Sequence, residues 1–422
     1  MKTTNVAVFM ASVAMLTTTV GCRKMEVDSE LIKEITLGEF PIDTIDSRHD
    51  WNLVHQMMVG VKADVPGENY ISKVQILTGN PYQGDTEVMA EKFAQSGDRV
   101  TLSFEMPITD SNFWVAAVSR SGKYYVMPSN NRDEFSFVGS DVISNGLLRT
   151  PVPQIFTYLF EENFPLPGDF DFNDVVLRIS KENPSANILK LKVRLDAVGA
   201  DKKIAAAIRL QGIRYEDVES VTIDEGKRFD EDYPTNRYFI DKEAIFTRGN
   251  DGSAVINLFD DAHWSLNPLS KDGRIVRLHY NTTKYEKEDE SATVDAQTRT
   301  YTIVAKDDKD VLSYVTLSNI DPFIMENYNS INMEVHTYKY KYTQVLWQFH
   351  TGQTADDDHV TWALLIPSSS FRYPVEGIPI GRYRNGEIFG AYNRYNHSFG
   401  QWGRNKDNSK DWWKYPTSVQ VY

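Results

Sequence analysis

The stretch Gly168-Asp169-Phe170-Asp171-Phe172-Asn173-Asp174-Val175-Val176 alternates oxygen-bearing and aromatic side chains directly before a short apolar run. In an extended chain, the oxygen-bearing side chains would share one side and the two phenylalanines the other. The valines, followed by Leu177, predict a buried strand. The stretch therefore predicts a β fold in which a strand emerges from an acidic loop.

Acidic side chains are also dense just upstream, before the turn-prone segment Pro165-Leu166-Pro167-Gly168. Such crowding of carboxylates is unfavourable unless a cation neutralises them or solvent separates them. Hard oxygen ligands at this density suit Ca²⁺ rather than a transition metal. We therefore predict a Ca²⁺ site whose candidate ligands are Asp169, Asp171, Asn173, Asp174, Glu161 and Glu162.

The same residues allow two other interpretations. The D-x-D-x-N opening fits the first three ligand positions of an EF-hand. However, its sixth position, normally Gly, is Asp174, and its twelfth, normally Glu, is Ser180. The pattern therefore excludes an EF-hand. A metal-free turn, in which Asp and Asn side chains bond to their own backbone, stays open.

The composition excludes several classes of protein. The chain has 422 residues, enough for two substantial hydrophobic cores. Its net charge of −14 and the lack of a basic run argue against nucleic acid as a partner, because phosphates would be repelled. The single cysteine, Cys22, excludes an intramolecular disulfide and a cysteine-based metal site.

The N-terminus has the layout of a bacterial lipoprotein signal peptide over residues 1–21, with a positive start and an apolar run. Thr19-Val20-Gly21-Cys22 resembles a lipobox, although Thr19 stands where Leu is usual. We expect a lipid on Cys22 to anchor the protein to the outer membrane, facing the periplasm or the cell surface, with residues 22–48 as a tether. An ordinary secretory peptide is the alternative.

Short apolar stretches between turn signals predict an all-β chain with two antiparallel β-sandwich-like domains, the second larger and with long loops. The first domain is expected over 49–142. Its strands are predicted at 51–61, 73–77, 99–105, 113–119 and 123–127, and 86–94 fits one or two helical turns.

The second domain is expected over 147–422. The alternation from Leu189 to Leu195 predicts a half-exposed strand, and 203–211 its return strand. Further strands are predicted at 253–259, 274–279, 299–305, 311–317, 332–342 and 360–366. Near the C-terminus, four large aromatic residues are expected to cover the sheet: Trp402, Trp412, Trp413 and Tyr415.

Three stretches resemble the LruC-type domain of uncharacterised bacterial envelope lipoproteins. The first is Phe160-Glu161-Glu162 with the acidic stretch quoted above, and the second is Leu195-Asp196-Ala197-Val198-Gly199-Ala200. The third runs from Thr361-Trp362-Ala363-Leu364-Leu365-Ile366-Pro367 through Phe371-Arg372-Tyr373-Pro374-Val375-Glu376-Gly377 to Phe399-Gly400-Gln401-Trp402 and Asp411-Trp412-Trp413. The loop between Ile380 and Phe399 departs from the shorter family pattern. The resemblance implies an all-β envelope protein with an acidic site of cation type, and it implies no enzymatic activity.

These observations predict a lipid-anchored envelope protein that binds or scaffolds, with a glycan or another protein as its ligand. No catalytic residue is predicted, because the sequence has no phosphate-binding Gly loop, no H-E-x-x-H and no G-x-S-x-G. An envelope carbohydrate-active enzyme is a second hypothesis, since glycoside hydrolysis needs only two acids across a cleft. A pilus or adhesion subunit is a third.

Overall fold

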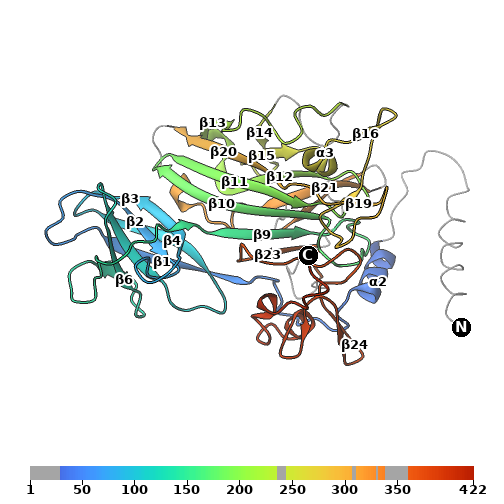
Figure 1. Ribbon diagram of the computed structural model, residues 1–422, viewed down its shortest axis with the longest axis horizontal. Helices are drawn as coiled ribbons and strands as arrows, with labels where there is room; N and C mark the ends of the chain where they lie inside the picture. Colours follow the sequence, from blue (N-terminus) through green and yellow to red (C-terminus); the bar gives the residue numbers. More distant parts are fainter. Residues whose placement is uncertain (1–28, 235–243, 307–309, 329–330, 338–359) are drawn as a thin grey trace, which may run out of the picture.

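The computed structural model describes residues 29–234, 244–306, 310–328, 331–337 and 360–422. Cys22 and the expected signal peptide lie outside these residues. The described chain is almost entirely β, as the sequence predicts, with a smaller and a larger group of strands (Figure 1). Its α-helices are short: α2 (Ser29–Glu39), α3 (Ala262–Leu266) and α4 (Phe399–Arg404).

The smaller group forms two sheets, with the orders β4-β1-β7 and β6-β5-β2-β3-β8. Its strands are β1 (Val54–Lys62), β2 (Ile71–Leu77), β3 (Glu87–Phe93), β4 (Arg99–Pro107), β5 (Trp114–Ser119), β6 (Tyr124–Pro128), β7 (Glu134–Ser136) and β8 (Val152–Pro153). Buried side chains from both sheets, such as Phe104 and Ile76, share one core, so the two sheets form a sandwich. The prediction of a helix over 86–94 is wrong, because this stretch is β3 and pairs antiparallel with β2.

The larger group forms a six-stranded sheet, β13-β20-β11-β10-β9-β23, and a five-stranded sheet, β14-β15-β12-β21-β22. The first contains β9 (Ile155–Phe160), β10 (Val175–Ser185), β11 (Ile188–Ala197), β13 (Val218–Ile223), β20 (Gln297–Ala305) and β23 (Ala363–Ile366). The second contains β12 (Ala205–Arg214), β14 (Phe246–Arg248), β15 (Ser253–Phe259), β21 (Pro322–Tyr328) and β22 (Ile331–His336).

One core lies between these two sheets. Along β11 the aliphatic residues from Leu189 to Leu195 are fully buried, while Lys192 and Arg194 are exposed, which confirms the predicted half-exposed strand. Ile208 of β12 and Ile256 of β15 belong to the same core from the opposite sheet. Burying each such side chain contributes roughly 1.5–3 kcal/mol, so the core holds the sheets together and fixes the loops at their ends.

Two later strand predictions are wrong over most of their length. The stretch 311–317 contains a 3-10 turn, Leu312–Tyr314, and no strand. The stretch 274–279 contains the two-residue strand Arg274–Ile275 and only the first residue of the strand His279–Tyr280. The short strands in the loops are β16 (Ser270–Lys271), β17 (Arg274–Ile275), β18 (His279–Tyr280), β19 (Ser291–Ala292), β24 (Arg382–Arg384), β25 (Glu387–Phe389), β26 (Asn393–Arg394) and β27 (His397–Ser398).

The two groups of strands meet through buried polar contacts. Glu105, at the end of β4, accepts hydrogen bonds from Thr316 Oγ1 at 2.5 Å and from the backbone N–H of Ser318 at 2.8 Å. Glu91 of β3 accepts the N–H of Asn183 in β10 at 3.0 Å. The domain boundaries stay predictions, but these contacts fix one group of strands against the other.

The N-terminal segment and the C-terminal aromatics pack together on the larger group. Figure 1 shows α2 beside the C-terminal segment, below β9 and β23. Phe40 is buried in the large core, and Trp51 stacks on Phe399 with ring centroids 5.5 Å apart. Part of the expected tether is therefore folded onto the sheet. Trp402 and Trp412 are buried in the same core, as the predicted aromatic cover requires.

Candidate cation site

The acidic loop connects β9 to β10, two neighbouring strands of the six-stranded sheet. Val175, the first residue of β10, pairs with Phe160, the last residue of β9, so the two ends of the loop lie side by side. Glu161 follows β9 directly and therefore faces the loop that returns to β10. This strand–loop–strand setting agrees with the exclusion of an EF-hand, which needs helices on both sides.

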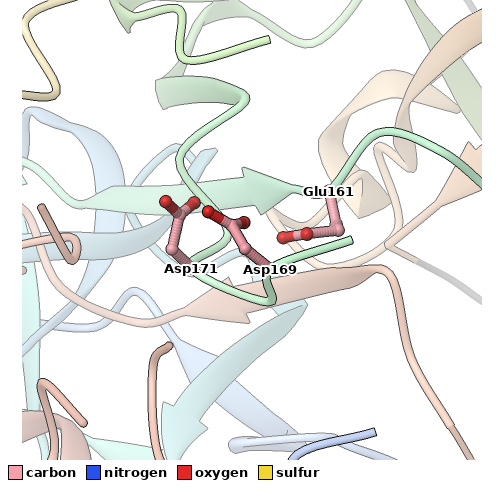
Figure 2. A group of neighbouring side chains, drawn as sticks. All are labelled: Glu161, Asp169 and Asp171. Carbon is pink, nitrogen blue, oxygen red and sulfur yellow. The ribbon is translucent and has the colours of Figure 1, made fainter. Parts of the chain in front are cut away.

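Three of the six candidate ligands come together. Carboxylate oxygens of Glu161, Asp169 and Asp171 lie within 4.8 Å of one another, and Figure 2 shows the Asp169 and Asp171 carboxylates side by side with Glu161 turned toward Asp169. Glu161 and Asp171 are buried, whereas Asp169 is exposed and gives the group access to solvent. Within the described parts of the chain, no cationic side chain pairs with any of these three carboxylates.

The loop backbone is curled rather than extended, which corrects one expectation. Phe170 and Phe172 both have φ of 57°, in a left-handed region that bulky residues seldom adopt. The cause is Glu161, whose Oε1 accepts the N–H of Phe170 at 2.8 Å and whose Oε2 accepts the N–H of Phe172 at 3.0 Å. The backbone thus wraps around one carboxylate, in the manner of an anion-binding nest.

Asp171 and Asn173 connect the loop to the C-terminal segment. Asp171 Oδ1 accepts the N–H of Asn173 at 2.9 Å, and its Oδ2 accepts the N–H of Gly377 at 2.8 Å. The Asn173 side chain is fully buried and donates from Nδ2 to the carbonyl of Pro374 at 3.2 Å. Its Oδ1 has no hydrogen-bond partner, so this oxygen is left with its lone pairs free.

Glu162 and Asp174 bond to neighbouring backbone amides. Glu162 accepts the N–H groups of Asp201 at 3.3 Å and Lys202 at 3.1 Å, and its own N–H donates to Asp174 Oδ2 at 2.5 Å. The Lys202 ammonium lies 2.9 Å from buried Glu326. The part of the acidic region around Glu162 therefore already contains a positive charge, that of the Lys202 side chain.

Burial and mutual repulsion disfavour the ionised form of these acids. Burial, and then the neighbouring Asp169, raise the pKa of Glu161 well above its usual range. The pKa of Asp171 is raised in the same way, first by burial and then by Asp169 and Glu161. Burial, followed by Glu161 and Glu162, also raises the pKa of Asp174. A bound cation would reverse this balance, because it favours the charged carboxylates.

Sequence reasoning did not single out Glu376, an acid whose charge acts on Asp171. Burial raises its pKa to about 7, although His279 nearby opposes the shift. Glu376 Oε2 is buried and has no hydrogen-bond partner. It lies more than 200 positions after the acidic loop, so no local spacing could have joined the two. The one signal was its place in a Pro-Val-Glu-Gly turn.

The donor atoms fit a hard cation. Every candidate is a carboxylate or amide oxygen, with no sulfur or imidazole among the three clustered side chains. Such a set suits Ca²⁺ better than zinc or copper. The orphaned oxygen of Asn173 offers a neutral ligand of the kind found in Ca²⁺ sites.

Comparison with known proteins places the chain in a family. Residues 187–413 match the family described as Domain of unknown function (DUF4842), a segment that includes Glu376 but begins after the acidic loop. A crystal structure from Bacteroides ovatus, described as that of a candidate lipoprotein, is 14% identical, with a TM-score of 0.45, and the match covers 88% of this chain and 93% of that one. No curated protein matches significantly.

These findings confirm the expectation of an uncharacterised domain family, while the LruC name stays a prediction. The matched segment makes up more than half of the 422 residues. The chain therefore belongs to the family of the domain of unknown function DUF4842.

Proposed function

We propose that this protein is a lipid-anchored envelope protein with a binding or scaffolding role, whose acidic loop holds a structural Ca²⁺ ion. The observation that carries the ion is the group of three carboxylates within 4.8 Å, two of them buried. Carboxylates buried this closely must either be protonated or share a positive charge, because unpaired buried charges are strongly destabilising, and a bound Ca²⁺ ion would let them stay ionised. The site stabilises the fold and catalyses nothing.

The positions of the positively charged side chains support a bound metal ion at one place only, beside Glu161 and Asp171. Beside Glu162 and Glu326, the ammonium of Lys202 supplies the positive charge. Beside Glu161 and Asp171, no side chain of the described residues does so. An ion bound there would complete the charge balance of the acidic region.

The metal-free turn explains part of the geometry. It accounts for the hydrogen bond from the N–H of Asn173 to Asp171 and for the amides that contact Glu161. It gives no reason for the buried Asn173 Oδ1 to lack a partner, and it needs a proton shared between Asp169 and Glu161 to explain why these carboxyl groups lie together. A cation accounts for both.

The test is thermal unfolding of the purified protein in EDTA and in excess Ca²⁺. A ligand at 100 times its Kd adds about 2.7 kcal/mol to the unfolding free energy, so the Tm should rise by several degrees with Ca²⁺. Asp171→Ala should lose this rise, whereas Asp85→Ala, at a highly exposed position, should keep it. Equal Tm values of the wild type in EDTA and in Ca²⁺ would contradict the proposal.

The anchor is proposed at Cys22, from the lipobox-like sequence. Among the described residues, no helix combines the length and the apolar character needed to span a bilayer. Cys22→Ser should move the protein from the outer-membrane fraction to the soluble fraction of the host cell. Retention of the variant in the membrane would argue against a lipid on this cysteine.

A further inference from the structure

We propose that the Ca²⁺ ion is also ligated by Glu376 and by the side-chain oxygen of Asn173, so that the C-terminal segment completes the site. This inference rests on the proposed function and extends it. It makes the ion a link between the acidic loop and the segment 374–378, which the family match includes.

The orientation of Asn173 is fixed by its hydrogen bond. Because Nδ2 donates to the carbonyl of Pro374 at 3.2 Å, exchanging the amide N and O would place two acceptors against each other. Oδ1 therefore stays on the other branch of the amide, buried and without a donor. A buried acceptor without a donor is unfavourable, so a ligand at this atom has a physical reason.

A second oxygen without a hydrogen bond lies next to it. A Cβ added at Gly199 would collide with Asn173 Oδ1 and would lie 2.8 Å from Glu376 Oε2. The two oxygens therefore converge on the bare α-carbon of Gly199. The nearest ion-pair partner of Glu376 Oε2 is His279 Nδ1, at 3.4 Å and outside hydrogen-bond geometry. Both oxygens thus retain lone pairs for a cation.

Position 199 requires glycine because a side chain has no room there, and not because of the backbone conformation. Its φ is not in the left-handed region, so a side chain would cause no backbone strain there. Its N–H donates to the carbonyls of Asn173 at 3.1 Å and Asp174 at 3.2 Å, which holds this turn against the acidic loop. Any side chain at this position would displace the two oxygens.

The segment that carries Glu376 is already joined to the loop. The N–H of Gly377 donates to Asp171, and Asp169 Oδ2 lies 3.9 Å from the position of a Cβ on Gly377. The carboxylate of Glu376 lies outside the group of three within 4.8 Å, but it is close enough to Asp169 and Asp171 for their negative charges to repel one another. With it, ligands come from the residue after β9, from the acidic loop and from the C-terminal segment, and so many oxygens favour Ca²⁺ over the smaller six-coordinate Mg²⁺.

The test is calorimetric titration of the metal-free full-length protein with Ca²⁺. Glu376→Gln, which keeps the side-chain shape, and Gly199→Ala, which removes no carboxylate, should each weaken Ca²⁺ binding by at least about tenfold. The matched controls are Glu387→Gln, at an exposed residue, and Gly84→Ala, where a Cβ meets only open space. Both controls should bind Ca²⁺ like the wild type.

The outcomes separate this inference from the proposed function. If the wild type binds Ca²⁺ and Glu376→Gln binds it with unchanged affinity, the role of Glu376 is overturned while the structural ion stands. If the wild type binds no Ca²⁺, both proposals fail. Circular dichroism in EDTA identifies any variant that has not folded, and Glu376→Gln keeps the test decisive should Gly199→Ala misfold.

Discussion

The backbone N–H of Gly377 donates to Oδ2 of Asp171 at 2.8 Å, joining two residues that are 206 positions apart in the chain. A second hydrogen bond joins the same two segments, because the N–H of Ile380 donates to the carbonyl of Phe170 at 2.8 Å. The acidic loop and the C-terminal segment are therefore one structural unit. A change at either side should therefore alter the other.

Asp169→Asn should have opposite effects with and without Ca²⁺. In EDTA at pH 8 the variant should unfold at a higher Tm than the wild type, because Asp169 repels the buried Glu161 and Asp171. In Ca²⁺ it should unfold at a lower Tm, because a charged ligand is lost. Differential scanning fluorimetry measures both values, with Asp85→Asn as the exposed control. A variant less stable in both conditions would contradict the cation site.

The stability of the metal-free protein should fall as the pH rises from 6.5 to 8. Burial raises the pKa of Glu376 and of Glu326 to about 7, above the unfolded value near 4.5. Groups with a raised folded-state pKa stabilise the protein at low pH and lose this effect as the pH passes that pKa. Buried His49, whose pKa is lowered to about 4, contributes with the opposite sign only below its unfolded value of 6.5, so the interval avoids it.

The Tm in EDTA, measured across this interval, should fall less steeply for Glu376→Gln than for the wild type. The increase in Tm caused by Ca²⁺ should grow over the same interval, since the ion competes with protons for the carboxylates. An increase in Tm that shrinks as the pH rises would be inconsistent with carboxylate ligands.

Trp51→Ala should destabilise the protein by about 3–5 kcal/mol, the usual range for removing a large buried aromatic side chain. Trp51 is buried between Phe399, on which it stacks, and Trp402, whose ring centroid lies 5.5 Å away. Urea unfolding gives the free-energy change. Tyr70→Ala, at a residue that is 63% exposed, should change the free energy of unfolding little. A small effect of Trp51→Ala would mean that the contact of Trp51 with Phe399 and Trp402 contributes little to the stability of the fold.

Glu105→Ala should loosen the contact between the two groups of strands. The buried carboxylate accepts hydrogen bonds from Thr316 and Ser318, so its removal leaves donors unpaired at a cost of about 1–3 kcal/mol. Calorimetric unfolding should broaden or split into two transitions, as expected when two cores lose their coupling. Glu134→Ala, at an exposed position in β7, is the control. A single sharp transition with unchanged Tm for Glu105→Ala would show that other contacts join the groups.

The strands that the sequence predicts best are those with one buried face. In β11, burial on one side imposes a period of two that the residues display directly. In β3 the period breaks, because a register shift opposite Ile76 and Leu77 leaves the neighbouring residues Met89 and Ala90 both buried. Its Glu, Met, Ala and Lys residues also favour a helix in isolation, so pairing with β2 overrides local propensity.

For the site, too, the sequence identifies residues that are close together in the chain and misses one that is distant. Asp169 and Asp171 could be singled out because their spacing is visible within a few residues, and the structure brings them to Glu161. The curled backbone could not be predicted, because nothing in the local sequence indicates that two phenylalanines adopt φ of 57°. Glu376 becomes a neighbour only when the C-terminal segment folds back across the sheet edge, which no pattern near it records.

The two phenylalanines of the acidic loop face away from its carboxylates, and this gives the loop a mechanical role. Phe170 meets Phe40 edge-on at 5.1 Å, and Phe172 lies 6.5 Å from Phe399. Phe40 directly follows α2, so the N-terminal helix is joined to the loop on the side of its phenylalanines. Tension applied to the N-terminus would reach α2 first, where the hydroxyl of Thr36 donates to the carbonyl of Pro165 at 3.0 Å. The aromatic contact between Phe40 and Phe170 would then carry the load into the core.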